Sequence, residues 1–372
     1  MTIYFLISAY DNLYDDGIIY LAEGLKDHNV NIYANRDYWQ LDLNGNYLFN
    51  YKKDFDPTTA DVVILSNNWT QFIDPLNFST YRKDIPKWVF NSGSKFSTVY
   101  VDNMDGYNTF SFTEEARKFD FILRCKKNKL TFNYPNMYPW VLGYQNRVLT
   151  EKQNIAIENK KFEIAVNFNY THGYEHQLRK FAKKNILALF PKQLINPIVS
   201  KGDRPENHLS SLMWDQTFKK HNPEYFSNLE NSLIVATFCG DMIPGLPSNP
   251  TPYLLGGNKA KIKKYIFEGL SYLSGTKNRI IQWDSWRFWE TLALGSVALH
   301  VDLEKYGVEL PVMPQNWQHY IGIDLDHINR DIERILDDRE TVYSIAKKGE
   351  IWAMTNYSPT ASAQRFLKLI NP

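Results

Sequence analysis

The sequence of 372 residues has few of the features that define several common classes of protein. Its two cysteines, Cys125 and Cys239, are far apart and lack the spacing of metal ligands, which argues against a disulfide scaffold or a zinc site. No run approaches the roughly 18 apolar residues of a membrane span. The apolar N-terminus lacks the basic segment and cleavage site of a signal peptide. We therefore expect a protein of a reducing compartment, in the cytoplasm, without a membrane span.

An excess of charge of one sign is also missing. Lysine and arginine total 42 residues, aspartate and glutamate total 41, and the formal net charge is +1. A strongly basic balance is the usual sign of a protein that binds nucleic acid or an anionic membrane. The near-zero net charge gives no argument for either partner, and we expect no nucleic acid among the partners.

Several catalytic motifs are absent as well. The sequence holds no G-x-x-x-x-G-K-[ST], no G-x-G-x-x-G, no H-E-x-x-H and no G-x-S-x-G, the signatures of four large enzyme groups. Asp324-Leu325-Asp326 comes nearest to a D-x-D metal motif. The residues that follow it look like the start of a helix, so we expect capping there. We predict no metal and no other cofactor.

The sequence does contain a regular alternation of apolar strands and amphipathic helices. Residues 3–8, 18–28 and 30–34 form a strand, a helix and a strand, and this spacing predicts a parallel sheet. The chain is long enough for two such α/β domains. Further strands of the first domain are expected at residues 60–65, 87–90 and 119–125.

The loop after the first strand is longer than a simple connection requires. It carries Asp11 and Asp16 among several polar and aromatic residues. Ligands of open α/β sheets bind at the carboxyl ends of strands, so this loop is a candidate acceptor surface and either aspartate a candidate general base. The alternative for Asp16 is that it caps the helix that follows.

A polar segment at 149–161 without apolar periodicity separates the two predicted domains. We place the first domain at 1–150 and the second at 160–355, and residues 356–372 form a last helix that could cross back to the first domain. Strands of the second domain are expected at 162–168, 232–238 and 320–323.

A long proline- and glycine-rich loop, residues 243–259, precedes a basic helix at 259–273. So long a loop in a compact domain is usually functional, although a plain surface excursion is the alternative. We expect Ile262, Ile266, Phe267 and Leu270 to face inward from the helix. Its lysines would form a solvated face, from which Lys264 could reach a phosphate.

The most informative segment is 279–301, a strand, a short helix and a second strand. Ser285 is a suitable N-cap, Gly295 lies where a helix needs a C′ glycine, and Phe288, Leu292 and Trp289 are expected inward. The free N–H groups at such a helix start bind anions. Arg287 in the first turn suits a diphosphate, and Glu290 one turn deeper suits a ribose diol. The alternative is a surface ion pair between Arg287 and Glu290.

The segment WETLALGSVALH resembles the donor-binding helix of GT-B glycosyltransferases, and SWRFWETLALG resembles the S-x-R-x-x-E-A-L-x-x-G run of exostosin-like members. The resemblance implies two Rossmann-like domains that face each other across a cleft. It also implies that Glu290 holds the ribose of a nucleotide-sugar, with Ser285 and Arg287 near the diphosphate. Many retaining members carry a second glutamate where this chain has Gln282, so the stereochemical course stays open.

In GT-B enzymes the first strand-to-helix loop of the second domain commonly faces the diphosphate. By this resemblance Thr171, Gly173 and Arg179 are candidate donor-binding residues, and His172 is a candidate catalytic residue, although it could equally be a solvent-exposed loop histidine.

The predicted function is therefore transfer of a sugar, hexosyl or pentosyl, from a nucleotide-sugar to a carbohydrate or other hydroxyl acceptor, such as a glycan or glycoconjugate. The reaction would need no metal and would belong to carbohydrate biosynthesis. Two alternatives remain on the same scaffold, because a fold does not determine a function. One is a non-catalytic protein that binds nucleotide or carbohydrate, and the other is a nucleotide-sugar epimerase.

Overall fold

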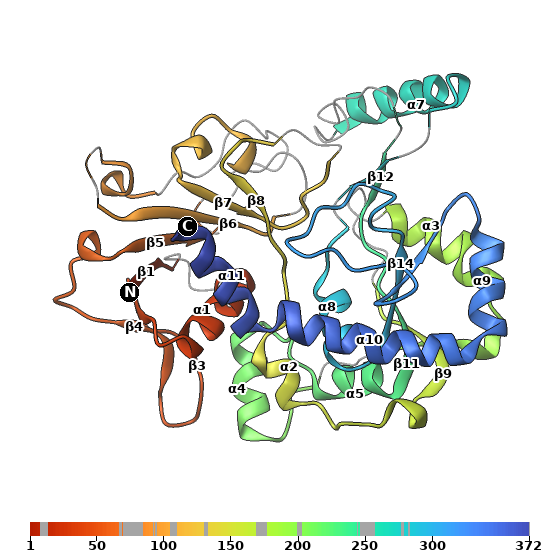
Figure 1. The fold of residues 1–372 in the computed structure, drawn as a ribbon, viewed down its shortest axis with the longest axis horizontal. Helices are drawn as coiled ribbons and strands as arrows, with labels where there is room; N and C mark the ends of the chain where they lie inside the picture. The colour runs from red at the N-terminus through yellow and green to blue at the C-terminus, as the bar shows by residue number, and fades with distance from the viewer. Residues whose placement is uncertain are drawn as a thin grey trace.

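A computed structural model shows two α/β units, each built on a sheet of mainly parallel strands (Figure 1). The predicted fold class, two Rossmann-like domains, is confirmed. The structure describes residues 1–7, 14–66, 69, 85–91, 93, 95–104, 110–129, 133–168, 177–198, 203–243, 245, 257–276, 279–281 and 283–371.

The first sheet has the strand order β3-β4-β2-β1-β5-β6-β7-β8. Its strands are parallel except for the antiparallel pair β3 and β4. The central strands are apolar because both of their faces are covered. The bounds are β1 (Thr2–Leu6), β2 (Asn31–Ala34), β3 (Tyr38–Gln40), β4 (Tyr47–Tyr51), β5 (Val62–Ser66), β6 (Ser97–Asp102), β7 (Phe121–Arg124) and β8 (Met137–Pro139).

One predicted strand of this sheet is wrong. Residues Lys87–Phe90 form a short 3₁₀ helix after Pro86, and the neighbour of β5 is β6. In this short helix the backbone N–H groups are used in local turns, from Val89 to the Pro86 carbonyl at 3.0 Å and from Asn91 to the Trp88 carbonyl at 3.2 Å, and not in a ladder with a neighbouring strand. By contrast, β6 holds the β-branched and aromatic run Thr98-Val99-Tyr100-Val101 that favours a pleated, buried position.

The second sheet is wholly parallel, in the order β10-β9-β11-β14-β15. A separate antiparallel ribbon pairs β12, which follows β11 in the chain, with β13, which comes before the helix that precedes β14. The bounds are β9 (Lys161–Val166), β10 (Ile195–Pro197), β11 (Ser232–Ala236), β12 (Asp241–Ile243), β13 (Arg279–Ile281), β14 (Val297–Val301) and β15 (Ile321–Ile323).

Helices cover the faces of both sheets, except for α7, which projects from the second unit at the top of Figure 1. The bounds are α1 (Asp16–Asp27), α2 (Asn146–Thr150), α3 (Gln177–Asn185), α4 (His208–Gln216), α5 (Pro223–Asn231), α7 (Gly257–Leu273), α8 (Trp286–Ala293), α9 (Ile328–Asp337), α10 (Arg339–Tyr357) and α11 (Pro359–Ile370). Within the described ranges, no helix is both long and apolar enough to span a bilayer.

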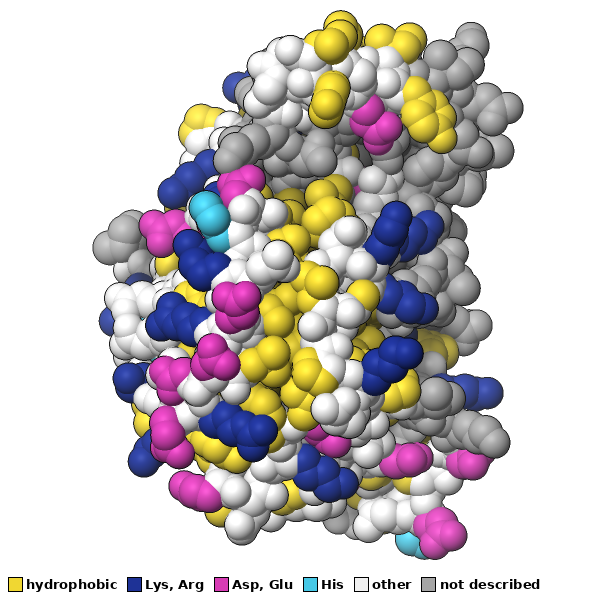
Figure 2. All heavy atoms as spheres, turned by 90° about the vertical axis from the view of Figure 1, so that its right-hand side faces the viewer, with side chains coloured by type: hydrophobic (Ala, Val, Ile, Leu, Met, Phe, Trp, Pro, Cys, Tyr) yellow, Lys and Arg dark blue, Asp and Glu magenta, His cyan; other side chains and the backbone are white. Residues whose placement is uncertain are grey.

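Helix α7 turns apolar residues outward. Ile266 is 55% exposed and Leu270 is 46% exposed, and Figure 2 shows apolar side chains gathered over α7 at the top of the molecule. The predicted inward orientation of these two residues is therefore wrong.

The last helix joins the two units. Helix α10 runs along the second unit and continues into α11, which lies beside α1 of the first (Figure 1). The hydroxyl of Tyr20 in α1 donates to the carbonyl of Tyr357, 2.9 Å away. The rings of Trp289 and Tyr357 lie 4.6 Å apart. Because one apolar core contains β1, α8 and α11 residues, the two units pack as one body.

Candidate functional site

Helix α8 is the element that positions the candidate site. Ser285 is its N-cap in extended conformation, and Gly295 follows its end at φ 71°, a conformation that glycine adopts without strain. Phe288, Trp289 and Leu292 are fully buried, so the predicted inward face is confirmed. The helix is therefore held rigidly, with its N-terminus turned towards the first unit.

The start of α8 contacts the start of α1 directly. The indole N–H of Trp286 donates to Asp16 Oδ2, and Asn103 Nδ2 donates to Asp16 Oδ1 at 2.6 Å. Just before α8, the backbone N–H of Leu142 donates to Asp284 at 3.0 Å. The resemblance implies two domains that face each other, and here Asp16 of the first unit and Trp286 of the second are in direct contact.

Two buried polar atoms at the start of α8 have no hydrogen-bond partner in the described structure: Ser285 Oγ and Arg287 Nε. The Ser285 side chain makes no capping bond to its own helix, although its position is that of an N-cap. Buried polar groups are nearly always satisfied, and an arginine and a hydroxyl beside free N–H groups suit an anionic ligand.

Glu290 is not part of a surface ion pair. It is only 5% exposed, and its Oε2 accepts a 2.9 Å hydrogen bond from the Tyr225 hydroxyl. Its other oxygen lies 3.8 Å from the Arg147 guanidinium. Burial raises the pKa of Glu290, and Arg147 and the Tyr225 hydrogen bond oppose that rise.

Lys220 is a residue of this site that the sequence did not single out. Its ammonium lies 4.6 Å from the centre of the Trp286 ring and 5.5 Å from that of Tyr14. Burial lowers the pKa of Lys220, and the nearby Asp16 carboxylate opposes this. Nothing in the local sequence marks Lys220, because the residues it meets lie far away along the chain.

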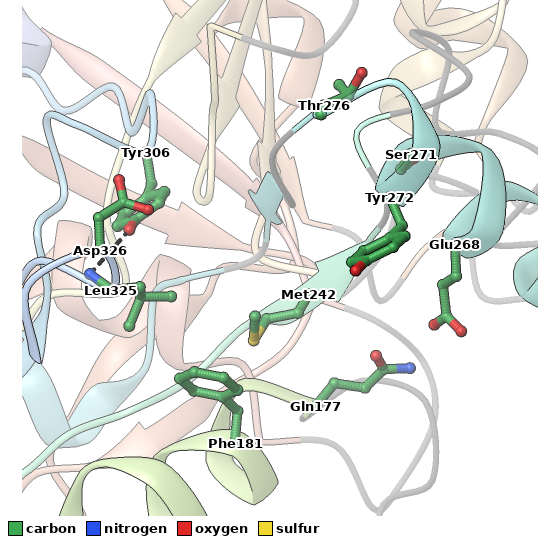
Figure 3. A pocket seen from close by; sticks show the side chains of 11 residues that line it. Gln177, Phe181, Met242, Glu268, Ser271, Tyr272, Thr276, Tyr306, Leu325 and Asp326 are labelled. Carbon is green, nitrogen blue, oxygen red and sulfur yellow. Dashed lines mark hydrogen bonds between the residues drawn. The ribbon is translucent and has the colours of Figure 1, made fainter.

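A cavity of about 780 Å³ opens near the carboxyl ends of the strands of the second sheet, and no residue of α8 lines it. Its walls come from segments that follow β9, β11, β14 and β15, the positions where α/β sheets bind ligands. Figure 3 shows the rings of Phe181, Tyr272 and Tyr306 around it, with Met242 between them. Its size and aromatic lining are typical of small-molecule sites.

The other predicted residues lie elsewhere or outside the described part of the chain. Arg179 is buried beneath the end of β11, where Nε donates to the Phe238 carbonyl at 3.0 Å, a structural contact. Lys264 lies on α7 without a described side chain. Asp11, Thr171, His172 and Gly173 fall outside the described residues.

The acids of the D-x-D-like motif bind a lysine and do not cap a helix. Asp324 and Asp326 both accept from Lys305, the latter at 2.8 Å. The N-cap position of α9 belongs to His327, which makes no side-chain cap, so the expectation of capping is wrong. Among the described residues no group of three or more His, Cys, Asp or Glu side chains is placed to hold a metal ion.

No protein-family model matches the chain, and no curated protein matches it in sequence. Solved structures match it over its whole length. An alpha-glucosyltransferase in complex with UDP and a 13-mer DNA containing a HMU base has a TM-score of 0.53 at 10% identity, covering 100% of both chains. An alpha-glucosyltransferase with UDP-glucose and DNA containing an abasic site gives 0.51 at 9%, and one with UDP gives 0.50 at 10%, each covering 100% of this chain and 99% of that chain. At these identities the similarity concerns the fold, which is the GT-B type.

These structures correct the expectation that nucleic acid is excluded as a partner. Two of the three contain DNA, so a protein of this fold can bind nucleic acid. The physical reason is that net charge sums over the whole surface, whereas nucleic-acid binding depends on where the cations gather. A formal net charge of +1 therefore does not exclude nucleic acid as a partner.

Proposed function

We propose that the chain is a metal-independent glycosyltransferase that moves a sugar from a nucleotide-sugar, such as UDP-glucose, to an acceptor hydroxyl. The observation that carries the proposal is the start of α8, where buried Ser285 Oγ and Arg287 Nε lack partners opposite Asp16 of the other unit. The GT-B fold and the cavity near the carboxyl ends of the second sheet support it, since this is where such folds bind ligands.

The groups at the start of α8 suit the leaving diphosphate. When the bond from the anomeric carbon to the diphosphate breaks, negative charge develops on the phosphate oxygens. The free N–H groups of the first helical turn, Arg287 and Lys220 stabilise that charge from fixed positions. These cations would supply what a metal ion supplies in other glycosyltransferases.

Glu290 would hold the ribose. A carboxylate oxygen accepts more than one hydrogen bond, so the ribose hydroxyls can share Glu290 with Tyr225. The Arg147 guanidinium, 3.8 Å away, favours the ionised form that accepts these bonds.

On the acceptor side we propose Asp16 as the group that orients or deprotonates the acceptor hydroxyl, with Asp11 and His172 as further candidates. Burial raises the pKa of Asp16, which makes it a stronger base than an exposed aspartate. In an inverting reaction the acceptor oxygen attacks the anomeric carbon, the bond to the diphosphate breaks, and the proton passes to this base. In a retaining reaction the donor phosphate would take the proton, and the anomeric configuration of the product distinguishes the two.

The test is calorimetric titration of UDP and UDP-glucose into the wild type and into Arg287→Ala. A charge-assisted hydrogen bond contributes about 1.5–3 kcal/mol, so we expect the affinity to fall roughly tenfold to a hundredfold. Folding should change little, because Arg287 Nε has no hydrogen-bond partner to lose and because Glu290, on which Arg287 also acts electrostatically, keeps Arg147 and the Tyr225 hydrogen bond. Arg117→Ala is the matched control, since Arg117 forms an exposed pair with Glu114 on the first unit.

Equal affinities in Arg287→Ala and wild type would remove the start of α8 from the site, and a wild type that binds no nucleotide diphosphate would contradict the function. Product analysis with oligosaccharides, glycoconjugates and DNA as acceptors separates a transferase from a protein that only binds. Activity lost in EDTA and restored by Mg²⁺ or Mn²⁺ would contradict metal independence.

A further inference from the structure

His221 is a buried histidine to which the proposed reaction gives no role. It lies in the connection between α4 and α5 and is fully buried. Its two ring nitrogens meet side chains of opposite charge. Nδ1 lies 3.3 Å from Nη1 of Arg147, and Nε2 lies 3.0 Å from Oε1 of Glu151. A buried polar group without a partner is costly, and here both ring nitrogens have one.

These contacts determine where the proton of the ring lies. A guanidinium group can only donate hydrogen bonds, so Nδ1 of His221 accepts from Arg147. The proton of the neutral ring is then on Nε2, which donates to Glu151. Burial lowers the pKa of His221, the hydrogen bond to Glu151 opposes that effect, and the charge of Arg147 adds to it. At neutral pH the histidine is therefore an uncharged hydrogen-bond acceptor for Arg147.

A strained turn of the backbone places His221 in this position. Phe218 and Lys219, just before it in the chain, both have positive φ angles, 52° and 67°, a conformation that residues with a Cβ atom disfavour. Such strain persists only where the surrounding structure imposes it, and it is concentrated at functional sites. The same turn brings Lys220 to the start of α8. The turn therefore presents two neighbouring side chains to the candidate donor site.

The guanidinium group that His221 contacts is the one that faces Glu290. Its Nε donates to Gln145 at 2.9 Å, and its Nη2 donates to the Tyr14 hydroxyl at 3.2 Å. Nη2 also lies 3.8 Å from Oε1 of Glu290. Because the guanidinium group is planar and rigid, partners that fix Nη1 and Nε also fix the direction of Nη2. Loss of the acceptor at His221 would allow the group to turn away from the Glu290 carboxylate.

We propose that His221 is a positioning residue for the donor, which orients Glu290 through Arg147 and so makes the site select a ribonucleoside diphosphate over its 2′-deoxy analogue. This inference rests on the proposed function, because it requires that Glu290 holds the ribose. A 2′-deoxyribose lacks one of the two hydroxyls that the carboxylate would accept from. Only the ribonucleotide therefore gains from a carboxylate in the correct orientation.

The test is calorimetric titration of UDP and of 2′-deoxy-UDP into the wild type, His221→Asn and His221→Leu. Asparagine and leucine have nearly the same shape, and neither reaches Glu151. Only the asparagine oxygen, which lies close to the place of Nδ1, can accept a hydrogen bond from Arg147.

We expect the wild type and His221→Asn to prefer UDP by roughly tenfold or more, and His221→Leu to bind the two nucleotides about equally. The affinity for 2′-deoxy-UDP should be the same in all three proteins. His208→Leu is the matched control, because His208 is an exposed histidine at the start of α4, and it should behave as the wild type does.

A histidine that only supports the fold would give a different pattern, because its loss would weaken the binding of both nucleotides alike. That pattern in His221→Leu, an unchanged preference for UDP, or an equal loss of preference in His221→Asn would overturn the inference and leave the proposed function intact. A wild type that binds both nucleotides equally would overturn the inference together with the ribose role of Glu290. A wild type that binds no UDP would contradict the proposed function itself.

Arg147→Lys is a second variant that tests the same inference if His221→Leu does not fold. Lysine keeps the positive charge but has no rigid fork that can bond His221 and Gln145 together. The preference for UDP should therefore be lost in Arg147→Lys, and a preference equal to that of the wild type would overturn the inference.

Discussion

Glu290 and its neighbours form a network that links both units. Tyr225 in α5 and Arg147 in α2 both approach the Glu290 carboxylate in α8, and Arg147 also donates to Gln145 at 2.9 Å and to the Tyr14 hydroxyl at 3.2 Å. A buried charge is stable only when it is paired and hydrogen-bonded. The network therefore holds Glu290 in one orientation before any ligand arrives.

Replacing Glu290 by glutamine tests whether its charge stabilises the fold and whether it binds the ribose. The change removes the charge that faces Arg147 and keeps the side-chain size. Removing one partner of a buried pair costs about 3–5 kcal/mol at most, and the cost should be smaller here because Arg147 keeps Gln145 and Tyr14. If Glu290 also accepts the ribose hydroxyls, UDP affinity should fall roughly tenfold to a hundredfold.

Denaturant unfolding and calorimetric titration of UDP measure the two effects of Glu290→Gln separately. Tyr225→Phe is the control, because it removes the 2.9 Å hydrogen bond and leaves the charge. UDP should bind nearly normally to Tyr225→Phe. A Glu290→Gln protein that is less stable but binds UDP as the wild type does would make Glu290 a purely structural residue.

At the scale of elements, the crossing of α1 and α11 depends on a glycine. A Cβ atom placed on Gly24 would overlap the carbonyl of Pro359 and lie 2.8 Å from the Cβ of Ala363. The backbones of the two helices therefore approach each other more closely than any other residue at this position would permit. This contact, with the Tyr20–Tyr357 hydrogen bond, fastens the C-terminal helix to the first unit.

Gly24→Ala should separate these helices and lower the free energy of unfolding by about 1–3 kcal/mol, the usual cost of overpacking. Gly269→Ala is the matched control, since Gly269 is also helical and a Cβ there meets nothing within 4 Å. Alanine favours a helix by roughly 0.8–1.0 kcal/mol over glycine, so the control should be neutral or slightly more stable. Similar thermal unfolding of both variants would mean that the crossing does not depend on Gly24.

At the scale of the whole molecule, local patterns predict the sheet units better than the site. Segments such as β1, α1 and β2 follow from hydrophobic periodicity, and Ser285 and Gly295 mark the ends of α8 from their own chemistry. The partners of α8 could not be predicted in this way. Lys220, Tyr225 and Arg147 reach it from 65 to 143 residues away, and such contacts leave no local signal. The orientation of α7 was missed because amphipathicity identifies an apolar face without saying what it packs against.

The junction of the two units also contains a buried acid, Glu23, that should make stability depend on pH. Its carboxylate oxygen accepts a 2.8 Å hydrogen bond from the backbone N–H of Asn146, where the first unit meets α2. Burial raises the pKa of Glu23 from 4.5 to about 8, against the effects of that hydrogen bond and of Arg147. Asp284 before α8 behaves similarly, with burial raising its pKa to about 7.

The sign of the pH effect follows from these values. Between pH 4.5 and about 8 the folded chain keeps the Glu23 proton, whereas the unfolded chain has lost it. The folded state binds more protons, so this contribution to stability is complete below pH 4.5 and is lost as the pH rises to about 8. The slope from one such group is at most about 1.4 kcal/mol per pH unit.

Glu23→Gln resembles the protonated acid and can still accept a hydrogen bond from Asn146. The stability of this variant should therefore fall less steeply over this pH range and exceed that of the wild type at about pH 8 and above. Urea unfolding at a series of pH values measures this, with Glu114→Gln as the control because Glu114 is exposed; parallel curves for Glu23→Gln and wild type would show that Glu23 is ionised in the folded protein at neutral pH.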